Sequence, residues 1–262
     1  MAQMNMIQAL NSAMDIKLDQ DPSVVILGED IGYFGGVFRV TDGLQRKYGE
    51  SRVLDTPIAE GGILAAAIGM AVNGLRPVAE IQFADYIYPA MDQIVNEAAK
   101  MRYRTNGAFG CPLVIRAPYG AGVHGALYHS QSVEAFFCHV PGLKVVTPAT
   151  PYDAKGLLKA AIRDEDPVLY FEHKRTYRRV RGEVPEADYV VPIGVAEVKR
   201  EGRHLSVITY GAMVHQALEA AEAAEAEGVA VEVVDLRSLL PWDRETVARS
   251  VAKTNKVIVC HE

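Results

Sequence analysis

Short, mostly apolar runs recur along the first two thirds of this chain, with helical stretches between them. They are VVIL (24–27), VAEI (78–81), LVI (113–115), KVVTP (144–148) and VLYFE (168–172). Such runs, apolar on both faces and bounded by Gly, Pro or Asp, are typical of buried parallel strands. The alternation predicts an α/β fold with a doubly wound, mostly parallel sheet over residues 1–175.

Two helices are expected between these strands. Residues 60–73 are nearly all Gly, Ala, Ile, Leu and Met, which predicts a helix buried on most sides. Residues 89–104 open with Pro89, a favourable first-turn residue. Their spacing places one apolar face toward the core, formed by Met91, Ile94, Val95 and Ala98.

A polar stretch, HKRTYRRVRGEVPEADY (173–189), is interpreted as a linker or surface crossing. A second, βαβ-like unit follows, with strands and helices at 205–209, 212–227, 231–236, 243–253 and 256–262. We therefore expect two α/β domains, residues 1–185 and 190–262. Because the chain stops after a strand and a parallel sheet needs both faces covered, the second domain is expected to be incomplete.

The composition indicates a soluble globular protein, with 49% hydrophobic residues and a formal net charge of −6. No basic run occurs, which argues against nucleic acid or an anionic membrane as a partner. The three cysteines form no CxxC pair and are expected to be reduced thiols. The amino terminus lacks a signal-peptide pattern, and no apolar run approaches the roughly 20 residues that span a bilayer. We therefore expect a cytoplasmic protein.

Several familiar motifs are absent from the sequence. It contains no GxGxxG, GxxxxGK[ST] or GxSxG, so a dinucleotide, P-loop or esterase reading has no support. His124 and His129 lie in a Gly-rich loop but lack a clear third ligand, which disfavours a metal site on them.

Polar residues gather in three segments, DTPIAEGGI (55–63), AEIQFADYIYPAMDQIVNEAAK (79–100) and HGALYHSQSVEAFF (124–137). Each segment places polar groups at a strand's carboxyl end or a helix start, where open α/β sheets bind ligands. Glu60 begins an apolar helix and is expected in a partly dry site; the alternative is a first-turn Glu favoured by the helix dipole. Loop packing equally explains the polar and aromatic residues after the buried strand, Gln82, Phe83, Asp85 and Tyr86. For His129 the alternative is a structural histidine.

Together the three segments resemble the beta subunits of thiamine-diphosphate-dependent 2-oxo acid dehydrogenases, a transketolase-like family. The similarity runs from Met4 to Glu262. The stretches EIQFADYIYPAMDQIVNEAAKMRYR and HGALYHSQSVEAFF resemble the branched-chain (2-oxoisovalerate) members in particular. GGVFRVTDGLQRKYG, VVDLRSLLPWD and VAKTNKVIVCHE add to the resemblance.

The resemblance implies roles for four residues. Glu60 matches the glutamate that hydrogen-bonds N1′ of the cofactor's aminopyrimidine and drives its tautomerisation. Gln82 and Tyr86 match positions that line the aminopyrimidine pocket. His129 matches the active-site histidine beside the thiazolium ring, which is suited to deliver a proton to a lipoyl sulfur near neutral pH.

Some relatives also hold a structural potassium ion through backbone carbonyls and an acidic loop. The corresponding positions are Cys111, Leu113, Val114, Ala161, Asp164 and Asp166. Ala161 and Asp166 differ from the residue types expected there, although a carbonyl ligand does not depend on its side chain.

The resemblance also implies partners, because the chain has no GDG motif to hold Mg²⁺ and the cofactor's diphosphate. In the family an alpha subunit supplies that half of the site, in an α2β2 heterotetramer docked on a lipoyl acyltransferase core. The implied reaction is decarboxylation of a small branched-chain 2-oxo acid and acyl transfer to lipoamide. Two alternatives stay open: pyruvate or acetoin as the substrate, and a non-catalytic scaffold subunit.

Overall fold

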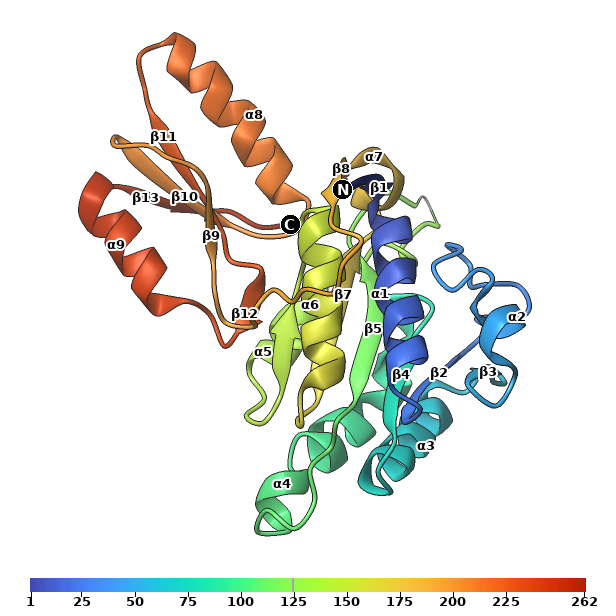
Figure 1. The fold of residues 1–262 in the computed structure, drawn as a ribbon. Helices are drawn as coiled ribbons and strands as arrows, with labels where there is room; N and C mark the ends of the chain where they lie inside the picture. Colours follow the sequence, from blue (N-terminus) through green and yellow to red (C-terminus); the bar gives the residue numbers. More distant parts are fainter. Residues whose placement is uncertain (124) are drawn as a thin grey trace.

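A seven-stranded sheet forms the centre of the computed structural model, which describes residues 1–123 and 125–262 (Figure 1). Its strand order is β12-β6-β7-β5-β4-β2-β3, and every neighbouring pair except β12 and β6 is parallel. The predicted mostly parallel sheet is therefore confirmed. The strands are β2 (Val24–Gly28), β3 (Val53–Asp55), β4 (Arg76–Glu80), β5 (Val114–Tyr119), β6 (Lys144–Val146), β7 (Val168–His173) and β12 (Ser238–Leu240).

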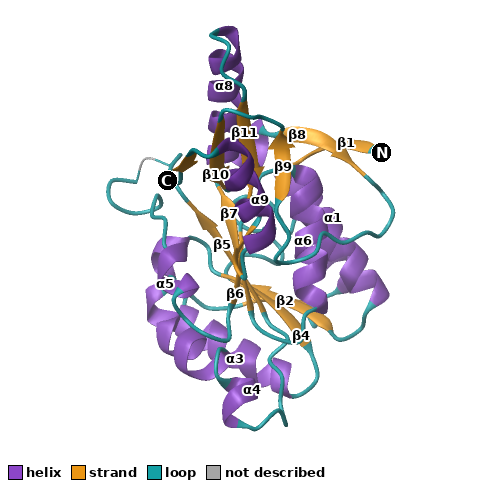
Figure 2. Ribbon diagram, turned by 90° about the vertical axis from the view of Figure 1, so that its left-hand side faces the viewer, coloured by secondary structure: helices purple, strands orange, loops and turns teal. Residues whose placement is uncertain are grey.

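Helices cover both faces of this sheet, as a doubly wound fold requires (Figure 2). Successive side chains of a strand point to opposite faces, so Val24 and Ile26 enter one core whereas Leu27 enters the other. The first core is completed by α1 (Met6–Gln20) and α6 (Pro151–Arg163), and the second by α3 (Glu60–Val72) and α5 (Glu134–Cys138). A short helix, α2 (Leu44–Tyr48), lies between β2 and β3 in the sequence.

Helix α3 buries only one side, which corrects the prediction that it is enclosed on most sides. Its larger residues, such as Ile63 and Leu64, are buried, whereas Gly62, Ala65 and Ala66 are exposed. The ordinary amphipathic arrangement explains this difference, because small residues can form the outer face of a helix as well as a buried one.

The expected helix at 89–104 is broken into shorter pieces. The Ala99 N–H donates to the carbonyl of Ile94 at 3.0 Å, a π-helical bond that inserts one extra residue into the turn. Ile94 and Ala98 are still buried, whereas Met91 and Val95 are only partly so. The pieces are η1 (Ala84–Tyr86), η2 (Tyr88–Ala90), η3 (Gln93–Ala98) and α4 (Met101–Arg104).

The polar stretch 173–189 is not simply a linker. Its first part forms α7 (Thr176–Arg179) and β8 (Arg181–Val184), and β8 pairs antiparallel with β1 (Ala2–Asn5). His173 and Lys174 are buried despite their polarity. The linker interpretation was wrong for residues 173–184, because the pairing with β1 could not be seen from local sequence.

A four-stranded sheet forms the second unit, in the order β13-β10-β11-β9. The three predicted strands are present and parallel, and β9 adds an antiparallel edge that the sequence did not reveal. The edge strand β13 is exposed. The elements are β9 (Glu197–Arg200), β10 (Leu205–Thr209), α8 (Met213–Ala226), β11 (Val231–Asp235), α9 (Arg244–Thr254) and β13 (Val257–Val259). None of the described helices is long and apolar enough to cross a membrane.

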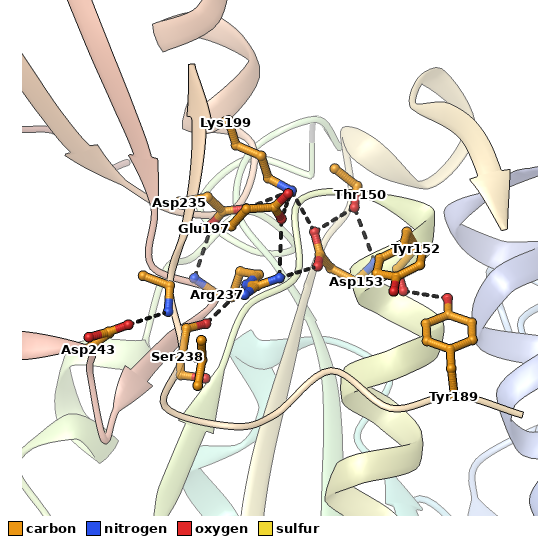
Figure 3. Close-up of polar contacts among 12 residues, drawn as sticks. Thr150, Tyr152, Asp153, Tyr189, Glu197, Lys199, Asp235, Arg237, Ser238 and Asp243 are labelled. Atoms are coloured by element: carbon orange, nitrogen blue, oxygen red, sulfur yellow. Dashed lines mark hydrogen bonds and ion pairs between the residues drawn. The ribbon is translucent and has the colours of Figure 1, made fainter. Parts of the chain in front are cut away.

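Buried ion pairs join the two sheets (Figure 3). Asp153, fully buried in the first turn of α6, accepts from Arg237 Nη1 at 3.0 Å and from Lys199 Nζ at 2.9 Å. Arg237 directly precedes β12, which pairs with β6 of the larger sheet. The segment after residue 190 therefore contributes to both sheets, and the division at 185 and 190 stays a prediction.

Candidate functional site

Polar residues gather at the carboxyl ends of β2, β4 and β5. Glu29 and Asp30 follow β2, Gln82 follows β4, and the loop that carries His129 follows β5. In an open α/β sheet this edge is the usual place for a ligand. Of the predicted residues, the structure joins Tyr86 and His129 directly, whereas Glu60 and Gln82 lie on neighbouring elements without bonding to that pair.

Glu60 is the first residue of α3, where the helix dipole favours its negative charge. It is partly exposed, and its carboxylate forms no hydrogen bond with any residue that the structure describes. The start of this helix lies close to η2, since a Cβ added to Gly61 would lie 3.0 Å from the Pro89 carbonyl oxygen. The Glu60 carboxylate, at the start of α3, therefore has no hydrogen-bond partner among the described residues and is available to a ligand.

Glu29 is a second carboxyl group at this edge, and the sequence reasoning missed it. Its side chain is buried, and Oε1 has no partner within the described residues. Burial, followed by the nearby charges of Glu60, Asp30 and Glu80, raises the pKa of Glu29. The available signal was an acidic residue directly after a fully apolar strand.

Tyr86 and His129 form the best-defined contact of the site. The Tyr86 hydroxyl lies 3.1 Å from His129 Nε2, and the Phe83 ring packs edge-on against the imidazole with centroids 4.4 Å apart. The other ring nitrogen, Nδ1, is buried, has no partner among the described residues and lies against Gly125, where an added Cβ would be 2.4 Å away. Of the two ring nitrogens, Nε2 is therefore the one that faces the Tyr86 hydroxyl.

Asp85 fixes the loop that carries His129. Its Oδ1 accepts the Ser130 N–H at 3.3 Å, and its buried Oδ2 has no partner among the described residues. His129 itself has a left-handed backbone, with φ of 70°, which is uncommon for a residue with a side chain. Gln82 donates to Asp30 Oδ2 at 3.3 Å, which ties the ends of β4 and β2 together. His124 lies outside the described residues.

Large apolar side chains surround this edge and are exposed. Tyr33 is 94% exposed, Ile58 84% and Leu127 68%. Exposed apolar groups concentrated around polar ones are characteristic of an interaction surface.

The six positions matched to a potassium site lie together, where the end of α6 meets the start of β5. The Cys111 N–H donates to the Glu165 carbonyl at 3.1 Å, which links the two segments. Asp164 accepts from Lys144 at 2.6 Å and Asp166 from Arg102 at 2.6 Å. Because these cations neutralise both carboxylates, a potassium ion here would depend on the backbone carbonyls, and the site stays a prediction.

Two family models together match most of the chain. The family model "Transketolase, pyrimidine binding domain" matches residues 2–180, and "Transketolase, C-terminal domain" matches residues 194–262. The 2-oxoisovalerate dehydrogenase subunit beta of Bacillus subtilis is 59% identical over 100% of this chain and 80% of its own length. The pyruvate dehydrogenase E1 component subunit beta of the same organism is 52% identical over 100% of this chain and 81% of its own length.

The chain belongs to the 2-oxo acid dehydrogenase beta-subunit family. This family is transketolase-like and depends on thiamine diphosphate, which confirms the predicted resemblance. Among solved structures, a split-gene transketolase described as an inactive β4 tetramer superposes with a TM-score of 0.81 at 27% identity. The superposition covers 99% of this beta subunit and 80% of the other chain.

The residues of this beta subunit fit one half of the family's cofactor. The Glu60 carboxylate could accept a hydrogen bond from a polar, planar ring, and the aromatic side chains of Phe83 and Tyr86 could pack against that ring. A metal-bound diphosphate needs clustered metal ligands. Among the described residues no three His, Cys, Asp or Glu side chains form such a group, and the sequence has no GDG.

Proposed function

We propose that this chain is the beta subunit of a branched-chain 2-oxo acid dehydrogenase and binds the aminopyrimidine half of thiamine diphosphate. The arrangement that supports this most directly is the bonded pair of Tyr86 and His129, together with Glu60 at the start of α3, at the edge where such sheets bind ligands. The 59% identity to a 2-oxoisovalerate dehydrogenase subunit supports the substrate class.

An alpha subunit is proposed to supply the diphosphate and Mg²⁺ half in an α2β2 heterotetramer. The exposed apolar rim formed by Tyr33, Ile58 and Leu127 supports a protein partner at this edge. A lipoyl acyltransferase core would receive the acyl group.

The cofactor would supply a nucleophilic carbon and an electron sink for decarboxylation. Glu60 would bond N1′ of its aminopyrimidine, and a low local dielectric would strengthen this bond. Gln82 and Tyr86 would line the ring. His129 would hand a proton at Nε2 to the acyl acceptor, with the imidazole oriented by Tyr86 and Phe83.

Substrate comparison tests the proposal. The chain is assembled with its alpha subunit, and decarboxylation of 3-methyl-2-oxobutanoate and of pyruvate is followed with an artificial electron acceptor. We expect kcat/KM to be higher for the branched acid. A preference for pyruvate would favour the second candidate, a pyruvate dehydrogenase subunit, which the 52% identity supports. No activity on any 2-oxo acid would favour a scaffold.

A further inference from the structure

A cavity beside α7 is lined by basic residues. Its volume is about 610 Å³, within the usual range of about 300–1,000 Å³ for small-molecule sites. We call it the basic cavity; its lining residues are Val37, Phe38, Ala121, Gly122, Val123, Lys174, Arg175, Tyr177, Arg178 and Arg179. The lining contains no carboxylate.

None of the four cations of the basic cavity forms an ion pair with a described residue. Arg175, Arg178 and Arg179 are exposed at α7. Two carboxylates lie near enough to attract them: Glu262, which also accepts from His173 at 2.6 Å, and Asp85, which accepts the Ser130 N–H. Four cations against two carboxylates leave a net positive charge at the cavity, so an anion there would be stabilised.

Lys174 is the clearest sign of a missing partner. Lys174 is 7% exposed, and its Nζ lies 3.5 Å from the Pro118 carbonyl oxygen and 5.8 Å from the centre of the Phe83 ring, without an ion pair to a described residue. A buried ammonium group is costly unless it is paired. Burial accordingly lowers the pKa of Lys174 to about 8, against the weaker opposing charges of Asp85 and Glu262.

The guanidinium groups and the apolar wall indicate the class of ligand. Arginine binds phosphate through two parallel hydrogen bonds, and a phosphate group carries nearly two negative charges, which suits several cations better than one carboxylate does. Val37 and Phe38 provide an apolar surface beside the cations. Gly122 allows close packing of the loop, since an added Cβ would lie 2.8 Å from Arg175 Cγ.

We propose that the basic cavity binds a small organic phosphate, with its charged groups among Lys174, Arg178 and Arg179 and its apolar part against Phe38. Phe38 packs on Phe83 with centroids 5.4 Å apart, and Phe83 packs on His129. The cavity is thus connected to His129 through the rings of Phe38 and Phe83. This inference does not depend on the proposed function.

Calorimetric titration of the chain, without Mg²⁺ or thiamine diphosphate, tests the proposal. ADP is the organic probe and inorganic pyrophosphate the charge-only probe. Both are expected to bind saturably and to weaken as salt rises. Near pH 8, ADP binding should also take up protons, because a nearby anion favours the charged form of Lys174. The uptake is measured by repeating the titration in buffers with different ionisation heats.

Two double variants distinguish loss of the binding site from a general loss of positive charge. Arg178→Ala with Arg179→Ala should weaken ADP binding by at least about tenfold, since the change removes two charge-assisted hydrogen-bond donors. Arg203→Ala with Arg244→Ala removes the same charge from the second unit and should leave affinity within about twofold, because screening weakens distant charges. Lys174→Met should abolish the proton uptake.

Three results would overturn the proposal. These are equal weakening by the two double variants, no binding of either probe, and binding of an acidic peptide such as oligoglutamate in place of the phosphates. The last result would make the cavity a protein docking site. The exposed arginine pair can be replaced without disturbing the core, so the test stands even if Lys174→Met does not fold.

Discussion

His129 is oriented by two aromatic neighbours, since the Tyr86 hydroxyl lies 3.1 Å from its Nε2 and the Phe83 ring packs edge-on against the imidazole. The sequence predicts four site residues from their places after strands and before helices and from the resemblance to the family: Glu60, Gln82, Tyr86 and His129. The hydrogen bond between Tyr86 and His129 joins residues 43 positions apart, which no local pattern encodes. Glu29 was missed for a related reason, because its burial becomes apparent only when the neighbouring elements are in place.

Tyr86→Phe should weaken acyl transfer while leaving cofactor activation intact. The change removes the hydroxyl that bonds Nε2, so the imidazole loses its orienting partner. We expect reductive acylation of lipoamide to fall by about tenfold, corresponding to about 1.4 kcal/mol. The matched control is Tyr88→Phe, whose hydroxyl instead bonds Gln131 at 2.9 Å. Equal losses in the two variants would show that the Tyr86 hydroxyl has no special role.

At the scale of elements, the strands were the most predictable part of the fold. Their runs are apolar on both faces, a signal that burial between two helical layers imposes. Strands β9 and β12 were missed because EVKR and SLL are short and their pairing is set by distant partners. The π-helical turn at η3 was missed because the apolar spacing of the segment also fits an α-helix.

A buried charge cluster crosses the central strands of the large sheet. Arg116 on β5 is fully buried and pairs with Glu80 on β4 at 2.5 Å and Glu172 on β7 at 2.6 Å. Arg116→Met would leave two buried carboxylates, so we expect the free energy of unfolding to fall by about 3–5 kcal/mol in urea titrations at neutral pH.

Mild acid should reduce that loss, because burial raises the pKa of Glu80 and its protonation removes the unpaired charge. Arg102→Met is the control, since its pair with Asp166 is largely exposed and should contribute less than about 1 kcal/mol. A loss below that of the control would mean that the cluster does not stabilise the sheet.

At the scale of the whole molecule, the ion-pair cluster that links the two sheets contains a pH-sensitive carboxyl group, that of Asp235. Asp235 is fully buried, and its Oδ2 lies 3.9 Å from Lys199 Nζ (Figure 3). The same ammonium group pairs with Asp153 at 2.9 Å. Burial raises the pKa of Asp235 to about 7, against the attraction of Lys199. The folded chain therefore keeps a proton that the unfolded chain releases near pH 3.8, the ordinary value.

The stabilising contribution of Asp235 is complete below pH 3.8 and is lost as pH rises toward about 7. Asp235→Asn should therefore raise the free energy of unfolding above pH 7 by up to about 4 kcal/mol, at about 1.4 kcal/mol per pKa unit, and change it little in acid. Chemical denaturation across pH measures this. Glu197→Gln, in the same network but 43% exposed, is the control. Parallel stability profiles for parent and Asp235→Asn would contradict the assignment.

We propose that Glu60 of this chain activates a cofactor whose diphosphate the alpha subunit holds. The most direct measurement is the rate of proton–deuterium exchange at C2 of bound thiamine diphosphate in the assembled heterotetramer. Glu60→Gln should slow this exchange by about 10²–10⁴-fold, as expected when an acid–base group is lost, while His129→Ala leaves it near the parent rate. Exchange at the parent rate in Glu60→Gln would show that Glu60 does not activate the cofactor. Slow exchange in His129→Ala alone would mean that His129, and not Glu60, does so.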